Sequence, residues 1–493
     1  MTRFGPAFAN RPDGGLDRGP TPHGARASAP SERVLTKKDV ARRATALHDA
    51  IKRAMAAGQH DAAREEAERL VTLAPTDAAA WNALGVALRA SGKLNAATAA
   101  YARAIEIKSD RPHFFSNWGN APKDLQRLDE AIAVHHRAVA LAPRSSGGFA
   151  NLGVALREAG RTDEALAAFE TALALDPSNA HLQFDRAQLL LMHGDYEAGW
   201  PAFEARWHRP EMRGTRFAQP LWDGRILPDQ TILLWPEQGF GDTILCARFV
   251  RLVKQRVGRV VLGCQPELVR LFSEMDGVDQ IVPFGAALPP FDVHCPLMSL
   301  PRFFVPDLAR VPAPARLRVP DAARRKLAPV LARGAGRLNV GIVWSGSVTF
   351  KTNHLRATTL ERFLDFACVP GVQLFSLQKG PRSVELAAAG AGALVINLAP
   401  HLDDFADTAA AVAGLDLVIM TDSSVAHLAG SLGTPIWNLL PFAAYWLYLK
   451  DRADTPWYPS MRLFRQPRPG DWDSVFAEAV GVLQAFVAGR KAA

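Results

Sequence analysis

The sequence has no long hydrophobic run and few cysteines, and both shortages limit what the protein can be. No stretch approaches about eighteen consecutive apolar residues, so we expect no transmembrane helix. The N-terminus lacks the apolar core of a secretory signal, and its Gly, Pro and Arg content predicts a disordered basic arm over 1–39. The cysteines form no CxxC pair, which argues against a disulfide framework or zinc site and predicts a cytoplasmic protein. They are Cys246, Cys264, Cys295 and Cys368.

A charge excess is also missing from most of the chain. The net charge is +8, but residues 1–43 hold nine Lys or Arg against four Asp or Glu, so much of the excess lies near the N-terminus. We therefore expect no nucleic-acid partner. A chain of 493 residues with 48% hydrophobic residues is long enough for two or three domains.

The chain does contain a sequence repeat with a period of 34 residues, between about residues 44 and 207. Glycine, alanine, proline and aromatic residues each recur in one phase of this period, as helix hairpins that pack closely require. The positions are Pro75, Pro143 and Pro177; Gly85, Gly119 and Gly153; Trp81, Phe115 and Phe149; Ala97, Ala131 and Ala165; Ala104, Ala138 and Ala172; and Tyr101 and Phe169, with His135 between them.

The periodic residues resemble the tetratricopeptide repeat. Three units are well formed (78–111, 112–145 and 146–179), a weaker one precedes them over 44–77, and a degenerate one follows and caps the stack. The resemblance predicts an α-solenoid over 40–207, whose concave face binds a protein or peptide. An irregular helical bundle is the alternative. Pro122 falls inside a predicted helix and is expected to kink it.

After the repeats, the pattern changes to short apolar runs separated by helical segments. This alternation predicts parallel α/β structure. We expect a linker over 208–228, then two Rossmann-like halves over 229–320 and 337–493, the second ending in a C-terminal helix. A Pro-rich stretch separates the halves, which would face a cleft. The expected strands are 231–235, 259–264, "DQIVPF", 338–346, 372–378, 393–398 and 415–420.

Ligands of parallel sheets bind beyond the carboxyl ends of the strands, where three loops carry polar residues. The first is "EQGFGD", in which Gly239 and Gly241 allow a tight turn and Asp242 begins a helix. We interpret Asp242 as a general base of the first half, with a helix N-cap as the alternative.

The second loop, "WSGSVTFKTNHLR", carries the cations Lys351, His354 and Arg356, which could neutralise a phosphate. An ordinary solvated loop is the alternative. Lys379, after another predicted strand, is a weaker candidate of the same kind.

The third loop, "TDSSVAHLAG", follows an apolar run and opens a helix whose N-terminus could hold a diphosphate. Ser423 and Ser424 add hydroxyls, His427 lies one turn on, and Asp422 could accept a hydrogen bond from a sugar. Helix capping alone explains Asp422 and one serine, but it explains neither His427 nor Gly430 inside the helix.

The first and third loops together resemble the heptosyltransferase-type family, glycosyltransferase family 9, over about residues 229–470. The resemblance implies two Rossmann-like domains in the GT-B arrangement. It also implies that Asp242 is the catalytic base and that Lys351 contacts phosphate, while Gln378 and Glu385 are candidates for a ribose contact. Ser424 stands where the family has glycine, which affects how closely a pyrophosphate can approach.

A repeat array joined to such a domain is similar to protein-modifying glycosyltransferases. The sequence therefore predicts an inverting, metal-independent glycosyltransferase without a cofactor. Its donor would be a nucleoside-diphosphate sugar, and its acceptor a hydroxyl of a protein presented by the repeats. The sequence shows no convincing DxD motif, which agrees with a reaction that needs no metal ion. The alternatives are a repeat scaffold with an inactive transferase-like domain, or a transferase that modifies lipopolysaccharide or another glycan.

Overall fold

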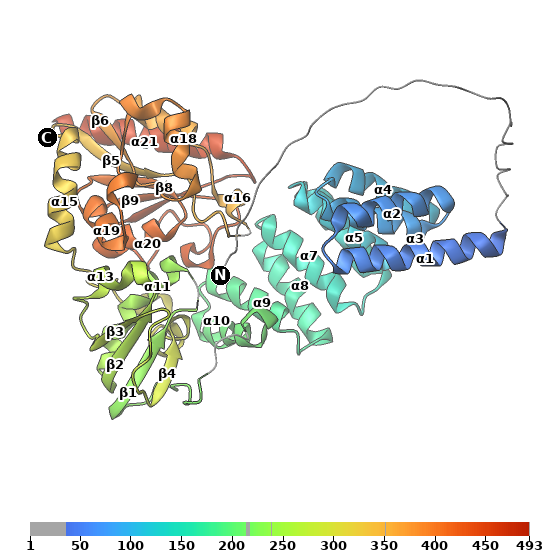
Figure 1. The fold of residues 1–493 in the computed structure, drawn as a ribbon, viewed down its shortest axis with the longest axis horizontal. Helices are drawn as coiled ribbons and strands as arrows, with labels where there is room; N and C mark the ends of the chain where they lie inside the picture. The colour runs from blue at the N-terminus through green and yellow to red at the C-terminus, as the bar shows by residue number, and fades with distance from the viewer. Residues whose placement is uncertain (1–35, 213–216, 238, 351, 493) are drawn as a thin grey trace, which may run out of the picture.

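The computed structural model describes residues 36–212, 217–237, 239–350 and 352–492. Among the described residues, ten α-helices precede the first strand, and consecutive helices pack as hairpins (Figure 1). They are α1 (Lys37–Ala56), α2 (His60–Leu73), α3 (Ala78–Ala90), α4 (Leu94–Ile107), α5 (Pro112–Asp124), α6 (Leu128–Leu141), α7 (Ser146–Glu158), α8 (Thr162–Leu175), α9 (Ala180–Met192) and α10 (Tyr196–Phe203). The helical solenoid predicted from the period is therefore present.

Glycine in the first helix of three units allows close contact with a ring from the second helix. A Cβ at Gly85 would lie 2.5 Å from the Tyr101 ring, and one at Gly153 would lie 2.6 Å from the Phe169 ring. Gly119 meets His135 in the same way, at 2.6 Å. These separations are far below a normal carbon–carbon contact of about 3.5–4.0 Å, so only glycine fits. The period thus records a steric requirement that each hairpin repeats.

Ion pairs join the first helices of successive units. Arg89 pairs with Asp124 at 2.7 Å, and Arg157 pairs with Asp185 at 2.7 Å. Pro122 lies in the last turn of α5, which continues to Asp124. A proline so near the helix end leaves few residues beyond it to be displaced, so the expected kink does not interrupt the helix.

The first α/β half contains a four-stranded parallel sheet in the order β3-β2-β1-β4. Its strands are β1 (Leu227–Trp235), β2 (Val257–Cys264), β3 (Gln280–Pro283) and β4 (Val293–Pro296). Its short helices are α11 (Phe240–Cys246), α12 (Val250–Lys254), α13 (Val269–Phe272) and α14 (Pro301–Phe304). The long helix expected after β1 is broken, because a 3-10 turn at Ala247–Phe249 separates α11 from α12.

The second half contains a six-stranded parallel sheet in the order β10-β9-β8-β5-β6-β7. Its strands are β5 (Leu338–Val343), β6 (Val372–Ser376), β7 (Val395–Asn397), β8 (Leu417–Thr421), β9 (Ile436–Leu440) and β10 (Met461–Arg465). Helix α15 (Asp321–Leu331) precedes the first strand of this sheet. The other helices of this half are α16 (Asn353–Arg356), α17 (Leu360–Ala367), α18 (Glu385–Ala388), α19 (Phe405–Ala413), α20 (Ser424–Leu432) and α21 (Trp472–Ala492). The prediction missed β4, β9 and β10.

Both faces of this second sheet are covered. One core contains side chains of β5 and β6 with Phe363 of α17 and Phe476 of α21. The opposite face contributes Phe375 and Met420 to a core shared with α19, α20 and the first half. Every residue of β6, β8 and β9 is accordingly buried, and β8 reads as an almost continuous apolar run.

The last repeat hairpin belongs to the α/β core as well as to the solenoid. Tyr196, Trp200 and Phe203 of α10 are almost fully buried in the same core as Ile232 of β1 and Ile244 of α11. In Figure 1, α9 and α10 lie against the first half while the earlier repeats project away from it. The expected domain boundary at residue 207 therefore cuts through a continuous core.

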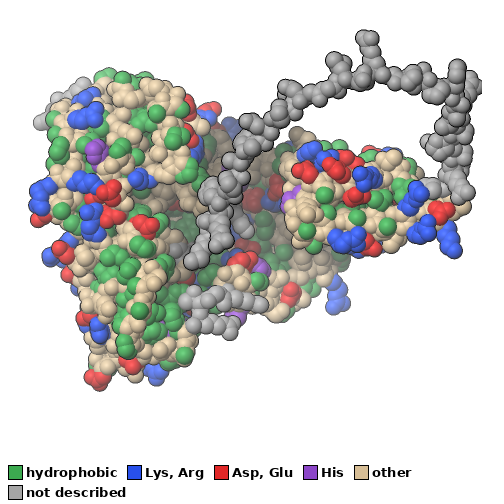
Figure 2. Space-filling model, viewed as in Figure 1, with side chains coloured by type: hydrophobic (Ala, Val, Ile, Leu, Met, Phe, Trp, Pro, Cys, Tyr) green, Lys and Arg blue, Asp and Glu red, His purple; other side chains and the backbone are tan. Residues whose placement is uncertain are grey.

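The linker predicted over 208–228 is shorter than expected. Trp222 is buried, its backbone N–H donates to the carbonyl of His294, and its ring packs 5.1 Å from that of Phe303. Residues 213–216 lie outside the described part of the chain, as does the arm up to residue 35. On the face shown in Figure 2, basic and acidic side chains are interspersed over the repeats, without a broad area of one sign.

Candidate functional site

The three candidate loops leave the carboxyl ends of strands at the points where strand order reverses. In the first half the chain runs outward from β1 to β3, while β4 lies on the other side of β1. In the second half, β6 and β7 extend one way from β5, and β8, β9 and β10 extend the other way. Asp242 follows β1, Arg356 follows β5 and Asp422 follows β8. Such reversal points open the crevice in which parallel α/β sheets bind ligands.

Asp242 lies in the first turn of α11, and Gly239 is the N-cap residue. Asp242 is therefore not the N-cap residue, which was the alternative role, but lies inside the helix. Its carboxylate accepts a hydrogen bond from the Tyr445 hydroxyl at 3.4 Å. Burial, followed by the charge of Asp422, raises the pKa of Asp242 to about 6, while Tyr445, Arg356 and the Gly239 backbone act in the opposite direction. A carboxylate that titrates so close to neutrality suits a general base.

Asp422 comes from the opposite half and is buried, whereas Asp242 is half-buried. Its carboxylate accepts hydrogen bonds from the Tyr448 hydroxyl and from Arg356, the latter at 3.4 Å. The Arg356 guanidinium also stacks 4.2 Å from the centre of the Phe350 ring, which is exposed. The structure thus brings Asp422 of the third loop into contact with Arg356 of the second.

His427 contacts the glycine loop of the first half. A Cβ at Gly241 would lie 2.7 Å from Cδ2 of the His427 ring, so glycine here permits α11 to approach α20. Nδ1 of His427 is within hydrogen-bond distance of the Tyr458 hydroxyl, at 3.1 Å. Burial lowers the pKa of His427 to about 4, and the cations Arg248 and Arg356 act in the same direction. The ring is therefore neutral at physiological pH.

The N-terminus of α20 is not capped by a side chain. Ser423 is the N-cap residue, but it makes no capping hydrogen bond, and its buried Oγ has no partner. Ser424 is the first residue of the helix. The first backbone N–H groups of a helix also lack intrahelical acceptors. Capping alone therefore does not account for these two serines.

Gly430, in contrast, has a packing explanation. A Cβ at this position would lie 2.4 Å from the ring of Tyr458, so the glycine makes room for an aromatic side chain. The sequence interpretation had counted Gly430 toward a ligand site. Its actual role is to let the segment after β9 pack on α20.

The other described candidates are engaged in contacts of their own. The Gln378 amide is used fully: Oε1 accepts from the N–H groups of Trp344 and Ser345, and Nε2 donates to two carbonyls. Glu385 pairs with Arg382, and Lys379 donates to the carbonyl of Ala399. His354 is exposed on α16, and Lys351 lies outside the described residues.

Sequence reasoning missed three tyrosines that contact the candidate residues: Tyr445, Tyr448 and Tyr458. All three come from residues 441–460, between β9 and β10, which carry no recognisable motif. The aromatic content of "YWLY" and "WY" is the only signal that could have marked the segment.

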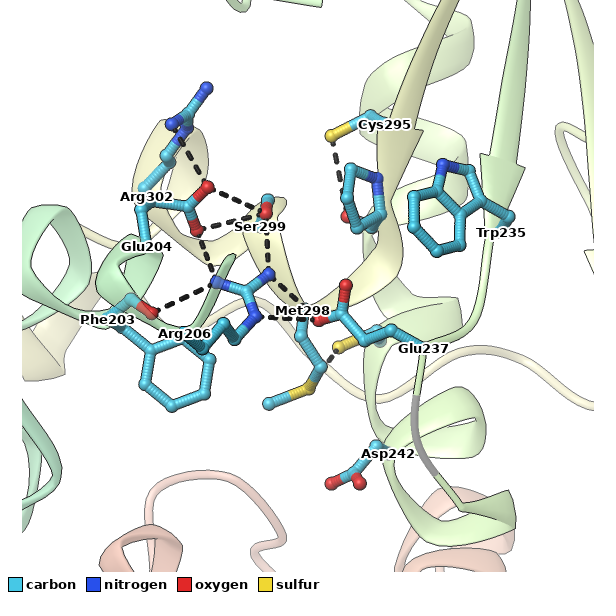
Figure 3. A network of polar contacts seen from close by, with 12 residues as sticks. Phe203, Glu204, Arg206, Trp235, Glu237, Asp242, Cys295, Met298, Ser299 and Arg302 are labelled. Atoms are coloured by element: carbon cyan, nitrogen blue, oxygen red, sulfur yellow. Dashed lines mark hydrogen bonds and ion pairs between the residues drawn. The ribbon is translucent and has the colours of Figure 1, made fainter. Parts of the chain in front are cut away.

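A second missed feature is the buried ion network around Arg206, which follows α10 (Figure 3). Its guanidinium donates to Glu237 at 2.8 and 3.1 Å, to Glu204 at 2.6 Å and to Ser299 at 2.7 Å. Glu237 belongs to the same loop as Asp242, and burial raises its pKa to about 7. The last repeat therefore holds the start of the candidate catalytic loop.

A further groove lies away from the candidate loops. A groove of about 510 Å³ between α17 and α21 is lined by Arg362, Cys368, Asp473 and Phe476, none of which is a candidate residue. Among the described side chains, no three His, Cys, Asp or Glu gather closely enough to hold a metal ion. No described helix is both long and apolar enough to cross a membrane.

Comparison with known proteins identifies the repeats. A model of the tetratricopeptide repeat matches residues 48–112 and 150–207. Protein FlbA of Caulobacter vibrioides is 29% identical over 341 residues, which are 63% of this chain and 56% of FlbA. This chain thus spans little more than half the length of that relative.

Several solved repeat structures match part of this chain at low similarity. MamA from Desulfovibrio magneticus RS-1 is 16% identical, with a TM-score of 0.30 over 35% of this chain and 95% of its own. PilF of Pseudomonas aeruginosa is 20% identical, with a TM-score of 0.32 over 36% and 79%. YrrB, described as a repeat protein with an unusual peptide-binding site, is 17% identical, with a TM-score of 0.28 over 32% and 81%. Together with the family match, the fold shows that the N-terminal region of this chain carries tetratricopeptide repeats.

Proposed function

We propose that this protein is an inverting glycosyltransferase of the GT-B type, whose donor is a nucleoside-diphosphate sugar. One observation carries the proposal. A carboxylate of raised pKa after β1 lies close to an Asp–Arg pair and an uncapped helix N-terminus after β8, at the reversal points of two parallel sheets. This arrangement supports the proposal, because a base and an anion-binding group would then face the crevice where parallel sheets bind ligands.

In the proposed reaction, an acceptor hydroxyl oxygen attacks the anomeric carbon of the sugar. The new carbon–oxygen bond forms as the bond to the diphosphate breaks, and the diphosphate leaves with the electron pair. Asp242 takes the proton of the hydroxyl, a contribution of about 10²- to 10⁴-fold in comparable enzymes. Attack opposite the leaving group inverts the configuration.

The charge that develops on the diphosphate needs positive groups. Arg356 exchanges its contact with Asp422 for the phosphates, and the first N–H groups of α20 with the hydroxyls of Ser423 and Ser424 complete the cradle. Asp422, freed from Arg356, accepts a hydrogen bond from a sugar hydroxyl. Protein cations and backbone dipoles, rather than a metal ion, stabilise the leaving group in this proposal. Lys351 and Gln378 stay as donor-binding predictions from the family resemblance.

The acceptor is proposed to be a protein. Tetratricopeptide repeats generally serve protein interaction, and here the repeat array is joined directly to the proposed transferase halves. A glycan or lipid acceptor would leave that array without a substrate to present.

The direct test is donor binding followed by transfer. Purified full-length protein is screened by thermal shift with ADP, UDP, GDP and CMP sugars, and a donor that binds should raise the melting temperature. Asp242→Asn should then lower kcat by about 10²- to 10⁴-fold with little change in donor Kd. In the wild type, kcat/KM should rise with pH through about 6 as Asp242 loses its proton.

Two outcomes would reject the proposal. Full turnover in Asp242→Asn would remove this residue from the chemistry. Failure of every sugar nucleotide to bind, in a protein whose repeats bind a partner, would favour the scaffold with an inactive domain.

A further inference from the structure

The connection between β9 and β10, residues 441–460, touches both candidate carboxylates; we call it the strap. Tyr445 donates to Asp242 of the first half at 3.4 Å, and Tyr448 donates to Asp422 of the second half. Two residues separate these tyrosines in the chain. One short segment therefore contacts a carboxylate from each half.

The strap also packs on the last repeat hairpin. The ring of Trp446, next to Tyr445, lies 5.2 Å from that of Trp200 in α10 at an interplanar angle of 89°. The indole N–H of Trp457 donates to the Tyr196 hydroxyl at 2.7 Å. Since Tyr445 and Trp446 are consecutive, a displacement of α10 acts on the residue adjoining the contact with Asp242.

Two further contacts reach the preceding repeat. A Cβ at Gly160, in the turn between α7 and α8, would lie 2.8 Å from the ring of Phe442. Lys450 pairs with Asp163 of α8 at 2.8 Å. The strap thus contacts the repeats at several points between α7 and α10.

The strap backbone is strained between its two sets of contacts. Leu449 has φ +56° and ψ −173°, and Asp451 has φ +52°. A branched side chain such as leucine is unfavourable with positive φ, and such conformations persist only where the surroundings impose them. Arg465 contributes to this, since its guanidinium donates to the carbonyls of Tyr448 at 2.6 Å and Leu449 at 3.1 Å.

We propose that the strap sets the positions of Asp242 and Asp422 according to the state of the repeats, with Tyr445 and Tyr448 as positioning residues. The inference rests on the proposed sugar transfer, which it extends to regulation by a protein bound to the repeats. A partner that shifts α8–α10 would move the strap and change the hydrogen bonds to the two carboxylates.

The charged groups around Asp242 help to set its pKa, so this pKa can report a change in the strap. A hydrogen bond from Tyr445 favours the charged carboxylate, so its loss should raise the pKa of Asp242 above about 6. Burial raises the pKa of Tyr445 well above its ordinary value, so this hydroxyl remains a donor. The other titratable and charged groups near Asp242 are Glu237 after β1, Cys246 on α11, Arg356 on α16, Asp422 after β8 and His427 on α20.

The experiment measures the pKa of Asp242 through stability and needs no activity. In the folded protein this pKa is raised above the ordinary 3.8, so the folded state binds more protons between about 4 and 6, and stability relative to Asp242→Asn falls as pH rises through that window. Tyr445→Phe keeps the ring and should move the upper limit of the window to higher pH. Tyr101→Phe, at a repeat position where another unit has Phe169, is the matched control and should leave the limit in place.

Coupling to the repeats is tested with Trp200→Phe, which touches neither carboxylate. We expect Trp200→Phe to shift the upper pH limit of the Asp242 window in the same direction as Tyr445→Phe does. In the double variant the two shifts should be less than additive. If Trp200→Phe does not fold, Lys450→Gln, at an exposed ion pair, takes its place. The strap proposal would be overturned if the upper pH limit of the Asp242 window stayed at its wild-type value both in Tyr445→Phe and in the variant that alters the contact with the repeats. Absence of donor binding in the wild type would instead reject the sugar transfer and leave these stability results to decide the strap.

Discussion

The first four helix hairpins and the fifth belong to one solenoid but have different structural roles. Side chains of α1–α8 build small cores within the solenoid, such as that of Leu84, Ala97 and Tyr101. The α9–α10 hairpin has one face on this solenoid, through Leu182 and Leu189, and another in the core of the α/β halves. Periodicity therefore predicts the shape of a repeat, but it does not predict where an independently folding unit ends.

The largest expected effect comes from comparing a chain truncated before this hairpin with a chain truncated after it. A chain that starts at residue 208 loses Tyr196, Trp200 and Phe203 from the common core, together with Arg206. Loss of each buried aromatic alone costs about 3–5 kcal/mol, so this chain should not fold. A chain that starts at residue 177 keeps the hairpin and should unfold cooperatively on heating. Equal melting behaviour of the two chains, followed by circular dichroism, would contradict the shared core.

Removal of Arg206 alone should be the next largest effect. Arg206→Ala leaves the buried Glu237 without a cation, and breaking such a pair from one side costs about 3–5 kcal/mol. The double variant Arg206→Met with Glu237→Gln removes both charges and should recover much of the loss. Arg89→Ala, at a partly exposed ion pair between repeats, is the control and should cost only about 0–1 kcal/mol. Chemical denaturation of the four proteins gives the comparison, and a similar loss in Arg206→Ala and Arg89→Ala would show that the network is not stabilising.

The same contrast explains how much of the molecule the sequence could predict. Gly85 and Gly153 recur because three hairpins have the same local contact, so the repeats were predictable from position alone. The two parallel sheets were predictable in part, since their buried strands are apolar runs, but β4, β9 and β10 were missed.

The candidate site was less predictable because its contacts join distant segments. Asp242 and Asp422 were identified from their loops, yet the tyrosines that bind them come from the strap, far from Asp242 in the chain. Gly430 and Gln378 had plausible ligand roles in the sequence, but the structure uses Gly430 for Tyr458 and the Gln378 amide to join the ends of β5 and β6. Only tertiary packing distinguishes such uses.

Within the solenoid, the steric meaning of the period can be tested with two glycines of one helix. Gly153→Ala places a Cβ 2.6 Å from the Phe169 ring and should destabilise by about 1–3 kcal/mol through overpacking. Gly147→Ala in the same α7 meets no atom within 4 Å and should stabilise by about 0.4–1 kcal/mol. Opposite shifts in melting temperature are expected. Shifts of the same sign would mean that helix propensity, not the ring contact, governs both sites.

His135 marks the place where the repeat departs from its own pattern. Tyr101 and Phe169 fill the equivalent positions, whereas both ring nitrogens of the fully buried His135 lack partners. Burial, with the nearby cations Lys123 and His136, lowers the pKa of His135 to about 4. Its folded-state pKa is therefore below the ordinary 6.5, so between these values the unfolded chain binds more protons, and stability falls as pH drops from about 6.5 to 4.

At neutral pH, His135→Phe has a smaller expected effect than removal of Arg206, and it restores the aromatic residue of the neighbouring units. It removes two unpaired buried nitrogens and should stabilise by about 1 kcal/mol at pH 7. Because phenylalanine cannot bind a proton, its advantage should grow as pH falls toward 4. Stability measured by denaturation from pH 7 to 4 gives the answer: parallel curves for wild type and His135→Phe would mean that His135 is paired in solution, and that this unit does not differ energetically from its neighbours.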